Sequence, residues 1–255
     1  MNALLKSLSI PTDTFILRKN QKGVRGLFSS RSYKKNEEIL RLPIYESKCR
    51  ILQRSSDLLY FRQESSLYNS LSRNGQFATL LCLSRKNHKL YAYWNLIPLT
   101  KSNLSWNIWF WSTQTVTKKS KLSLKAAEYY SSYLHKLRTD YTNFGLLYDE
   151  YISKYGVMMY KMKRKTFQDK CMLYRIIISA RGFGMINGQN ALVPLLDLMN
   201  HGSLKSYNVN WKFMEKDKVF VMSARKNIKK NTELLDSYGH TKQPYQFMTL
   251  YGFIP

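Results

Sequence analysis

The chain has 255 residues, of which 44% are hydrophobic and 22% are charged, which suits one soluble domain with a large insertion or two small domains. Lysine and arginine together number 41 against 16 acidic residues, so the formal net charge is +25. A charge of this size favours a polyanionic partner such as RNA or a ribonucleoprotein, although solubility alone also accounts for it.

Membrane and metal sites are not expected. No apolar run approaches the roughly 20 residues that a membrane-spanning helix needs, so we expect no membrane span. Cys49, Cys82 and Cys171 form no Cys-x-x-Cys pair, and the four histidines have no metal-ligand spacing with them, so we expect no metal. The odd and sparse cysteine count indicates a reducing compartment inside the cell; mitochondrion, cytoplasm and nucleus all stay open.

The N-terminal part is expected to be a small β unit. Residues 1–10 are apolar and are predicted to form the first strand. Residues 15–17 predict a short strand, a turn follows at 22–26 because two glycines allow positive φ, and the chain returns as a strand at 27–28. Residues 38–43 predict a further strand, which ends at a proline.

The middle of the chain changes to helical spacing. Apolar residues recur every three or four positions in four segments, which predicts helices at 63–83, 123–137, 144–159 and 166–178. Residues 91–100 contain a proline and are predicted to form a loop. A basic cluster suits either a solvated helix face or a nucleic-acid contact, and it comprises Lys161, Lys163, Arg164 and Lys165.

β character returns after residue 191. Residues 207–211 and 219–222 predict strands, and the polar residues 215–218 between them predict a hairpin turn. The chain therefore runs from β elements through a long helical stretch and back to β elements.

Five short motifs are spaced along this layout. They are Gly26-Leu27-Phe28, Arg181-Gly182-Phe183, the run from Pro194 through Asp197 to Asn200-His201, Ser237-Tyr238-Gly239 and Tyr251-Gly252-Phe253. Together with the layout they resemble a SET domain, in the branch typified by the methyltransferase of the Rubisco large subunit. The resemblance implies an α+β fold of small curved sheets with a C-terminal pseudoknot, split by a helical insertion. It divides the chain into the N-terminal part of the SET domain (1–47), the insertion (48–178) and the C-terminal part (179–255).

The resemblance implies S-adenosylmethionine as cofactor and assigns six residues to its site. In the family the backbone of an Asn-His pair holds the adenine, and here this pair is Asn200-His201, preceded by Asp197. Arg181 stands where the branch places an arginine near the cofactor carboxylate, which its forked, charged group suits. The turn that offers backbone to the methionine part of the cofactor contains Val24 and Arg25.

The same resemblance implies methyl transfer to a protein lysine, with Tyr238 and Tyr251 as catalytic residues and Phe253 as a wall of the lysine channel. A lysine must arrive neutral to attack, although its ordinary pKa is about 10.4. A desolvating aromatic channel beside a positive sulfonium lowers that pKa, and tyrosine hydroxyls align the amine with the methyl group. Two core tyrosines are the other interpretation of this pair.

The sequence departs from the family pattern in ways that bear on function. Val24 replaces a glycine found in many relatives and could crowd the cofactor. Asp236 replaces an apolar residue, and burying its charge would be unfavourable. The residues up to Pro255 contain no counterpart of the branch's C-terminal helical substrate-binding domain, so we expect the basic insertion or another protein to close the lysine channel.

Two functions stay open at this point. The first is a protein-lysine methyltransferase that acts on a ribosomal or other nucleic-acid-associated protein, with a histidine or an N-terminal amine as further possible acceptors. The second is a structural or assembly subunit of a ribonucleoprotein such as an organellar ribosome, with little or no catalysis. The motifs favour the first function, whereas the net charge and the altered Val24 and Asp236 positions favour the second.

Overall fold

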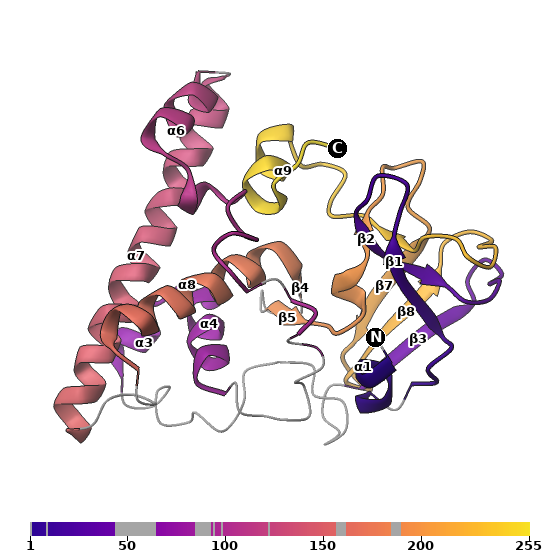
Figure 1. Cartoon of the computed structure of the whole chain (residues 1–255), viewed down its shortest axis with the longest axis horizontal. Helices are drawn as coiled ribbons and strands as arrows, with labels where there is room; N and C mark the ends of the chain where they lie inside the picture. Colours follow the sequence, from indigo (N-terminus) through magenta and orange to yellow (C-terminus); the bar gives the residue numbers. More distant parts are fainter. Residues whose placement is uncertain are drawn as a thin grey trace.

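The computed structural model describes residues 2–8, 10–43, 65–84, 93, 95–97, 99–121, 123–156, 162–184 and 190–255. Figure 1 shows two bodies, one of helices and one of small sheets, with helix α9 and the C-terminus lying between them. No helix within these ranges is long and apolar enough to cross a bilayer. The same residues contain no group of three or more potential ligands that could hold a metal ion.

The β body contains two antiparallel sheets, one of which joins the two ends of the chain. Strand β1 (Phe15–Lys19) pairs with β2 (Arg25–Ser29), close to the prediction. The second sheet has the order β3-β8-β7, with bounds Glu38–Pro43, Val219–Ala224 and Val209–Met214. Because β3 lies before the insertion and pairs with β8 after it, the two ends of the chain form a single folding unit. The predicted hairpin at 215–218 is confirmed.

The first predicted strand is wrong. Residues 1–10 contain a helix, α1 (Asn2–Ser7), in place of a strand. Leu4, Leu5 and Leu8 are all buried, and their spacing places them on one face of a helix, whereas a strand would have sent Leu4 and Leu5 to opposite sides. The apolar run is too short to distinguish the repeat of a helix from that of a strand.

The helical body is built on two long helices. Residues 123–137 and 144–159 were predicted as separate helices, but α7 (Leu124–Tyr155) is continuous, because no glycine cap or proline stands between them. It starts at Ser123, whose side chain accepts from the N–H of Ala126, and ends at Gly156 with φ 64°. The shorter helices are α3 (Ser66–Ser70), α4 (Arg73–Ser84), η3 (Ile108–Phe110) and α6 (Thr113–Ser120).

Helix α8 (Arg164–Arg181) connects the helical body to the β body. It packs on α4 and α7 and runs continuously through the predicted boundary at 178 and 179. At its end the chain turns directly into β4 (Gly182–Gly184), which pairs with β5 (Asn190–Leu192). The boundary predicted at 47 and 48 and Lys161 of the basic cluster lie outside the described residues, as do residues 91, 92, 94 and 98 of the loop predicted at 91–100, in which residues 95–97 form a turn and a bend.

The C-terminal segments cross at a short parallel pair. After η6 (Leu196–Leu198), β6 (Asn200–His201) pairs in parallel with β9 (Leu235–Asp236), as the expected pseudoknot requires. Helix α9 (Pro244–Tyr251) follows and ends at Gly252, whose φ is +81°. These crossings place the predicted site motifs at the junction of the two bodies.

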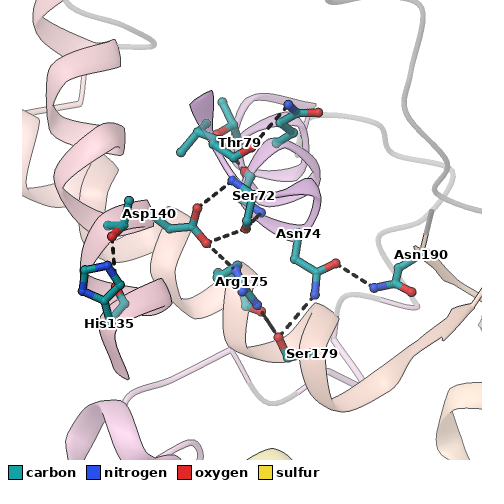
Figure 2. Close-up of polar contacts among 12 residues, drawn as sticks. Ser72, Asn74, Thr79, His135, Asp140, Arg175, Ser179 and Asn190 are labelled. Atoms are coloured by element: carbon teal, nitrogen blue, oxygen red, sulfur yellow. Dashed lines mark hydrogen bonds and ion pairs between the residues drawn. The ribbon is translucent and has the colours of Figure 1, made fainter. Parts of the chain in front are cut away.

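A buried ion pair fixes the helices of the insertion against each other. Arg175 of α8 donates to Asp140 of α7 over 2.7 Å, and both side chains are almost fully buried. Asp140 also accepts from the backbone and the hydroxyl of Ser72, which precedes α4, and Arg175 donates to Ser179 (Figure 2). The buried charges are therefore satisfied by groups from α7, α8 and the residue before α4, as buried charges require.

Removing one partner of this pair should destabilise the fold. Arg175→Met leaves the Asp140 carboxylate buried without its counter-charge, so we expect a loss of about 3–5 kcal/mol in the free energy of unfolding, measured by urea denaturation. The control is Asp149→Ala, which breaks the exposed Arg164–Asp149 pair and should change stability by about 0–1 kcal/mol. Equal effects of the two substitutions would contradict the structural role of the buried pair.

Candidate active site

Two cavities lie at the junction of the bodies and share one wall. The larger cavity, of about 1050 Å³, lies between the β1–β2 hairpin, the end of α8, β6 and the C-terminal residues. The smaller cavity, of about 270 Å³, lies between the α8–β4 corner, η6 and β9. Both are lined by Ala180, Arg181, Tyr238 and Tyr251. The two predicted catalytic tyrosines therefore stand where the cavities adjoin.

The tyrosine pair is held by backbone carbonyls. Tyr238 donates its hydroxyl to the carbonyl oxygen of Met199 over 2.6 Å, and Tyr251 donates to the carbonyl of Tyr238 over 3.4 Å. Their ring centroids are 4.7 Å apart. Burial raises the pKa of Tyr238 above its ordinary value and raises that of Tyr251 to about 12. Both are neutral phenols near pH 7, so they can orient a nucleophile through hydrogen bonds but do not serve as phenolate bases.

Asn200 connects the C-terminal crossing to the N-terminal hairpin. Its amide donates to the carbonyl of Arg25 over 3.0 Å and to Glu233 over 2.8 Å. Glu233 also accepts from Asn20, and both it and Asn200 fill the space beside Gly26, where any Cβ would collide with them. A side chain at position 26 would displace these two groups from their hydrogen bonds. The Asn200 side chain supports the crossing, and His201 follows it along the wall of the larger cavity.

His201 faces the aromatic C-terminus. Its Nδ1 accepts from the backbone N–H of Tyr238 over 3.2 Å, and its ring lies 4.9 Å from that of Phe247 and 6.0 Å from that of Phe253. Burial, and then the charge of Lys242, lowers the pKa of His201. The imidazole is therefore neutral near pH 7, in agreement with its role as an acceptor.

Arg181, which lines both cavities, contacts Asp197. Arg181 donates to the carbonyl oxygen of Asp197 over 2.5 Å and lies 3.9 Å from its carboxylate. Tyr93 donates to the same carboxylate over 2.8 Å. Burial raises the pKa of Asp197 to about 6 despite the opposing charge of Arg181. Asp197 lines the smaller cavity only, so its role is to position Arg181 and η6.

The remaining predicted residues are placed as follows. Val24 is 49% exposed and lines the larger cavity, so its isopropyl group narrows that space from one side. Arg25, whose backbone was predicted to contact the cofactor, is absent from the lining of both cavities, and its guanidinium donates to the carbonyl of Leu96 over 2.6 Å. Phe253, predicted as a wall of the lysine channel, does not stand at the predicted place, because it lines the larger cavity and not the smaller one. It is held there because Gly252 lets the chain turn tightly against Trp106.

Three residues at the site were not predicted as functional. Glu233 supports Asn200, as described above, and Asp236 lines the smaller cavity. Lys242 lines it too, and its amine donates to the carbonyl of Tyr238 over 2.5 Å. Glu233 could have been suspected as one of few acids in a basic chain, five positions before Tyr238. Lys242 carries no such signal among so many lysines.

Asp236 is the acidic residue that replaces an apolar residue of the family pattern, and the burial of its charge was expected to be unfavourable. It is 7% exposed and accepts from the N–H of Ser237 over 2.7 Å. Burial raises its pKa to about 6, although the N–H of Ser237 and the side chain of Trp211 act in the opposite direction. A polar fixed carboxylate thus stands in the smaller cavity, and it is mostly ionised at pH 7.

The raised pKa of Asp236 predicts a pH-dependent gain in stability on its removal. The pKa of Asp236 is higher in the folded chain than in the unfolded chain. Its deprotonation therefore destabilises the fold as pH rises from the unfolded pKa, about 3.9, through the folded pKa. Asp236→Asn should therefore raise the free energy of unfolding by roughly 1–2 kcal/mol above pH 7, and by little below pH 4. Urea denaturation at pH 4, 6 and 8 measures this difference, and a constant or inverted difference would contradict it.

The family follows from a comparison with known proteins. The sequence profile of the SET domain matches residues 24–239. Among solved structures, the SET domain of LSMT bound to lysine and AdoHcy superposes with a TM-score of 0.70 and 16% identity, over 99% of this chain and 56% of that one. Rubisco LSMT bound to sinefungin and monomethyllysine gives a TM-score of 0.70 and 16% identity, over 99% and 55%.

A third structure, Rubisco LSMT bound to AdoMet, gives a TM-score of 0.59 at 14% identity, over 99% of this chain and 55% of that one. The chain therefore spans a little over half the length of these solved chains. No curated protein sequence matches it significantly. The profile match covers most of the residues, and the superposition confirms the expected α+β architecture. The chain belongs to the SET-domain family.

Proposed function

We propose that the chain is an S-adenosylmethionine-dependent protein-lysine N-methyltransferase. The observation that carries this proposal is the shared wall: a large cavity and a small cavity adjoin at Tyr238 and Tyr251. Methyl transfer to an amine is an in-line displacement, so donor and acceptor must approach from opposite sides of one point. The solved SET domains of similar fold carry donor analogues together with lysine or a methylated lysine, which supports the same assignment.

The larger cavity fits the donor in size and chemistry. Its volume of about 1050 Å³ is at the upper end of the range for small-molecule sites. Arg181, whose guanidinium suits the cofactor carboxylate, lines it, and so do Asn200 and His201, the pair whose backbone we expect to hold the adenine. When bound, S-adenosylmethionine supplies a methyl group made electrophilic by the adjoining sulfonium.

The smaller cavity fits a lysine side chain. Its wall includes Asp197, whose buried carboxyl group is paired with Arg181 and Tyr93, Asp236, whose carboxyl group attracts a cationic side chain, and the rings of Tyr238 and Tyr251, which exclude water from the amine. Desolvation favours the neutral amine needed for attack. The phenol of Tyr238 donates to Met199, so its oxygen remains free to accept from the amine.

These carboxyl groups also bear on the substrate. A chain of net charge +25 repels a basic protein at long range, so a basic target requires negative charge at the channel. Asp236 supplies a carboxylate there, beside the cations Arg181 and Lys242, and its raised pKa of about 6 leaves it mostly ionised at pH 7, while Asp197 is paired with Arg181. We therefore propose a lysine on a ribosomal or other nucleic-acid-associated protein as the acceptor.

A ribonucleoprotein contact is the second proposal, and it is compatible with the first. The connection between α6 and α7 presents a run of cations, of which Lys118, Lys121 and Lys125 are exposed. A structural subunit without catalysis would have no need for two open cavities at one tyrosine pair. The positive charge of these lysines therefore supports binding to RNA, whereas the two cavities support catalysis at the tyrosine pair.

Tyr238→Phe tests the catalytic proposal. Loss of the hydroxyl should lower methyl transfer to ribosomal proteins on the order of 100-fold or more, because the amine loses its alignment. Binding of S-adenosylmethionine, measured by calorimetry, should stay within about threefold, because a phenylalanine keeps the ring that forms the wall. Tyr133→Phe is a matched control, since its hydroxyl is buried without a hydrogen-bond partner among the described residues. Absence of saturable donor binding in the unsubstituted protein would contradict the proposal.

Sedimentation with ribosomal particles tests the RNA contact. We expect stoichiometric association at about 50 mM salt and a loss of several orders of magnitude in affinity by about 200 mM, because bound counterions are released from the phosphates. Substituting Lys118, Lys121 and Lys125 together by Gln should reduce the salt dependence. Absence of cosedimentation at low salt would exclude this partner and leave the enzyme proposal standing.

A further inference from the structure

The amine of Lys242 lies at the tyrosine pair inside the smaller cavity. Its Nζ donates to the carbonyl oxygen of Tyr238 over 2.5 Å, and the hydroxyl of Tyr251 donates to that same oxygen over 3.4 Å. The side chain lines the smaller cavity together with both tyrosines and Asp236. A primary amine of the chain thus lines the cavity proposed for the substrate amine.

Local backbone geometry holds the lysine in this position. Gly239 has φ +106°, and its missing side chain leaves the space that Nζ occupies; a Cβ there would collide with this nitrogen. The N–H of Lys242 donates to the carbonyl of Gly239 over 3.2 Å, so the turn before α9 is closed by this residue. This placement of the amine requires no partner protein, because Tyr238, Gly239, Lys242 and Tyr251 all belong to the same chain.

The chemical state of the amine suits attack. Burial lowers the pKa of Lys242, which increases the share of neutral amine relative to an exposed lysine. The ionisable groups around it are His201, whose pKa the lysine lowers, Tyr238 and Tyr251 behind the shared carbonyl, and Arg181, Asp197 and Asp236 on the cavity wall. Asp236 can attract the ammonium form, and solvent at the mouth can accept its proton.

We propose that Lys242 is a site of methylation by the chain's own active site, within a single molecule. This inference rests on the proposed methyltransferase function. The ammonium first loses a proton to solvent, and the nitrogen lone pair then forms a bond to the methyl carbon. The bond from that carbon to sulfur breaks, and sulfur keeps the electron pair, which leaves S-adenosylhomocysteine and a methylammonium on the protein.

The test uses the full chain and a donor with a deuterated methyl group, with peptide mass spectrometry as the readout. Label should appear on Lys242, and its first-order rate constant should be the same at two protein concentrations tenfold apart. Lys242→Arg should remove this label, whereas Lys226→Arg, at an exposed lysine that donates only to a surface carbonyl, should leave it. Tyr251→Phe should slow labelling on the order of 100-fold.

Unlabelled methyl groups already present on Lys242 of the purified protein, and absent from purified Tyr251→Phe protein, would support the proposal equally. A rate that scales with protein concentration would overturn the intramolecular assignment. Donor binding measured by calorimetry separates the two hypotheses: binding without modification of Lys242 overturns this inference alone, and absence of binding overturns the proposed function together with it.

A second readout does not depend on catalysis. Because the charge of Lys242 lowers the pKa of His201, Lys242→Met should raise the pKa of His201 in an NMR titration, and Lys226→Met should not. An unchanged His201 titration in Lys242→Met would show that the amine does not lie in the cavity, and would overturn the proposal.

Discussion

One close contact holds the site together: Asn200 and Glu233 fill the space beside Gly26. Through it the crossing of β6 and β9 is fixed against the β1–β2 hairpin, although these segments are separated by the whole helical insertion. A larger residue at position 26 would displace these two side chains. Loss of either polar group would remove one hydrogen bond between the crossing and the hairpin, while Asn200 would still donate to Arg25 or Glu233 would still accept from Asn20. The contact places the hairpin on one side of the larger cavity and His201 on the other.

The insertion contributes to the same site through α8. Its last residue, Arg181, lines both cavities, and the chain then enters β4 without a loop. The buried network continues toward this corner, because Asn74 of α4 donates to Ser179 and accepts from Asn190 of β5 (Figure 2). Since polar groups in such a network depend on one another for partners, the position of Arg181 depends on the packing of helices far from the cavities.

Much of the β body could be predicted from sequence, and the residues show why. Strands β1, β3 and β8 have local β patterns with turns or a proline at their ends, and the spaced motifs at Arg181, Asn200, Tyr238 and Tyr251 do meet at one place. The helix at residues 2–7 could not be predicted, because a short apolar run suits either period. The roles of Glu233 and Lys242 arise from contacts that turns and crossings create, and only Asp236, an acid in place of an apolar residue, was marked in the sequence.

The central claim is that the two cavities are the two entrances of one reaction site. The most direct measurement is a crystal structure of the chain with S-adenosylhomocysteine. The account predicts its sulfur in the larger cavity, directed at the gap beside Tyr238 and Tyr251, with its carboxylate on Arg181. Density for the ligand elsewhere, or tyrosine hydroxyls turned away from the sulfur, would contradict the account.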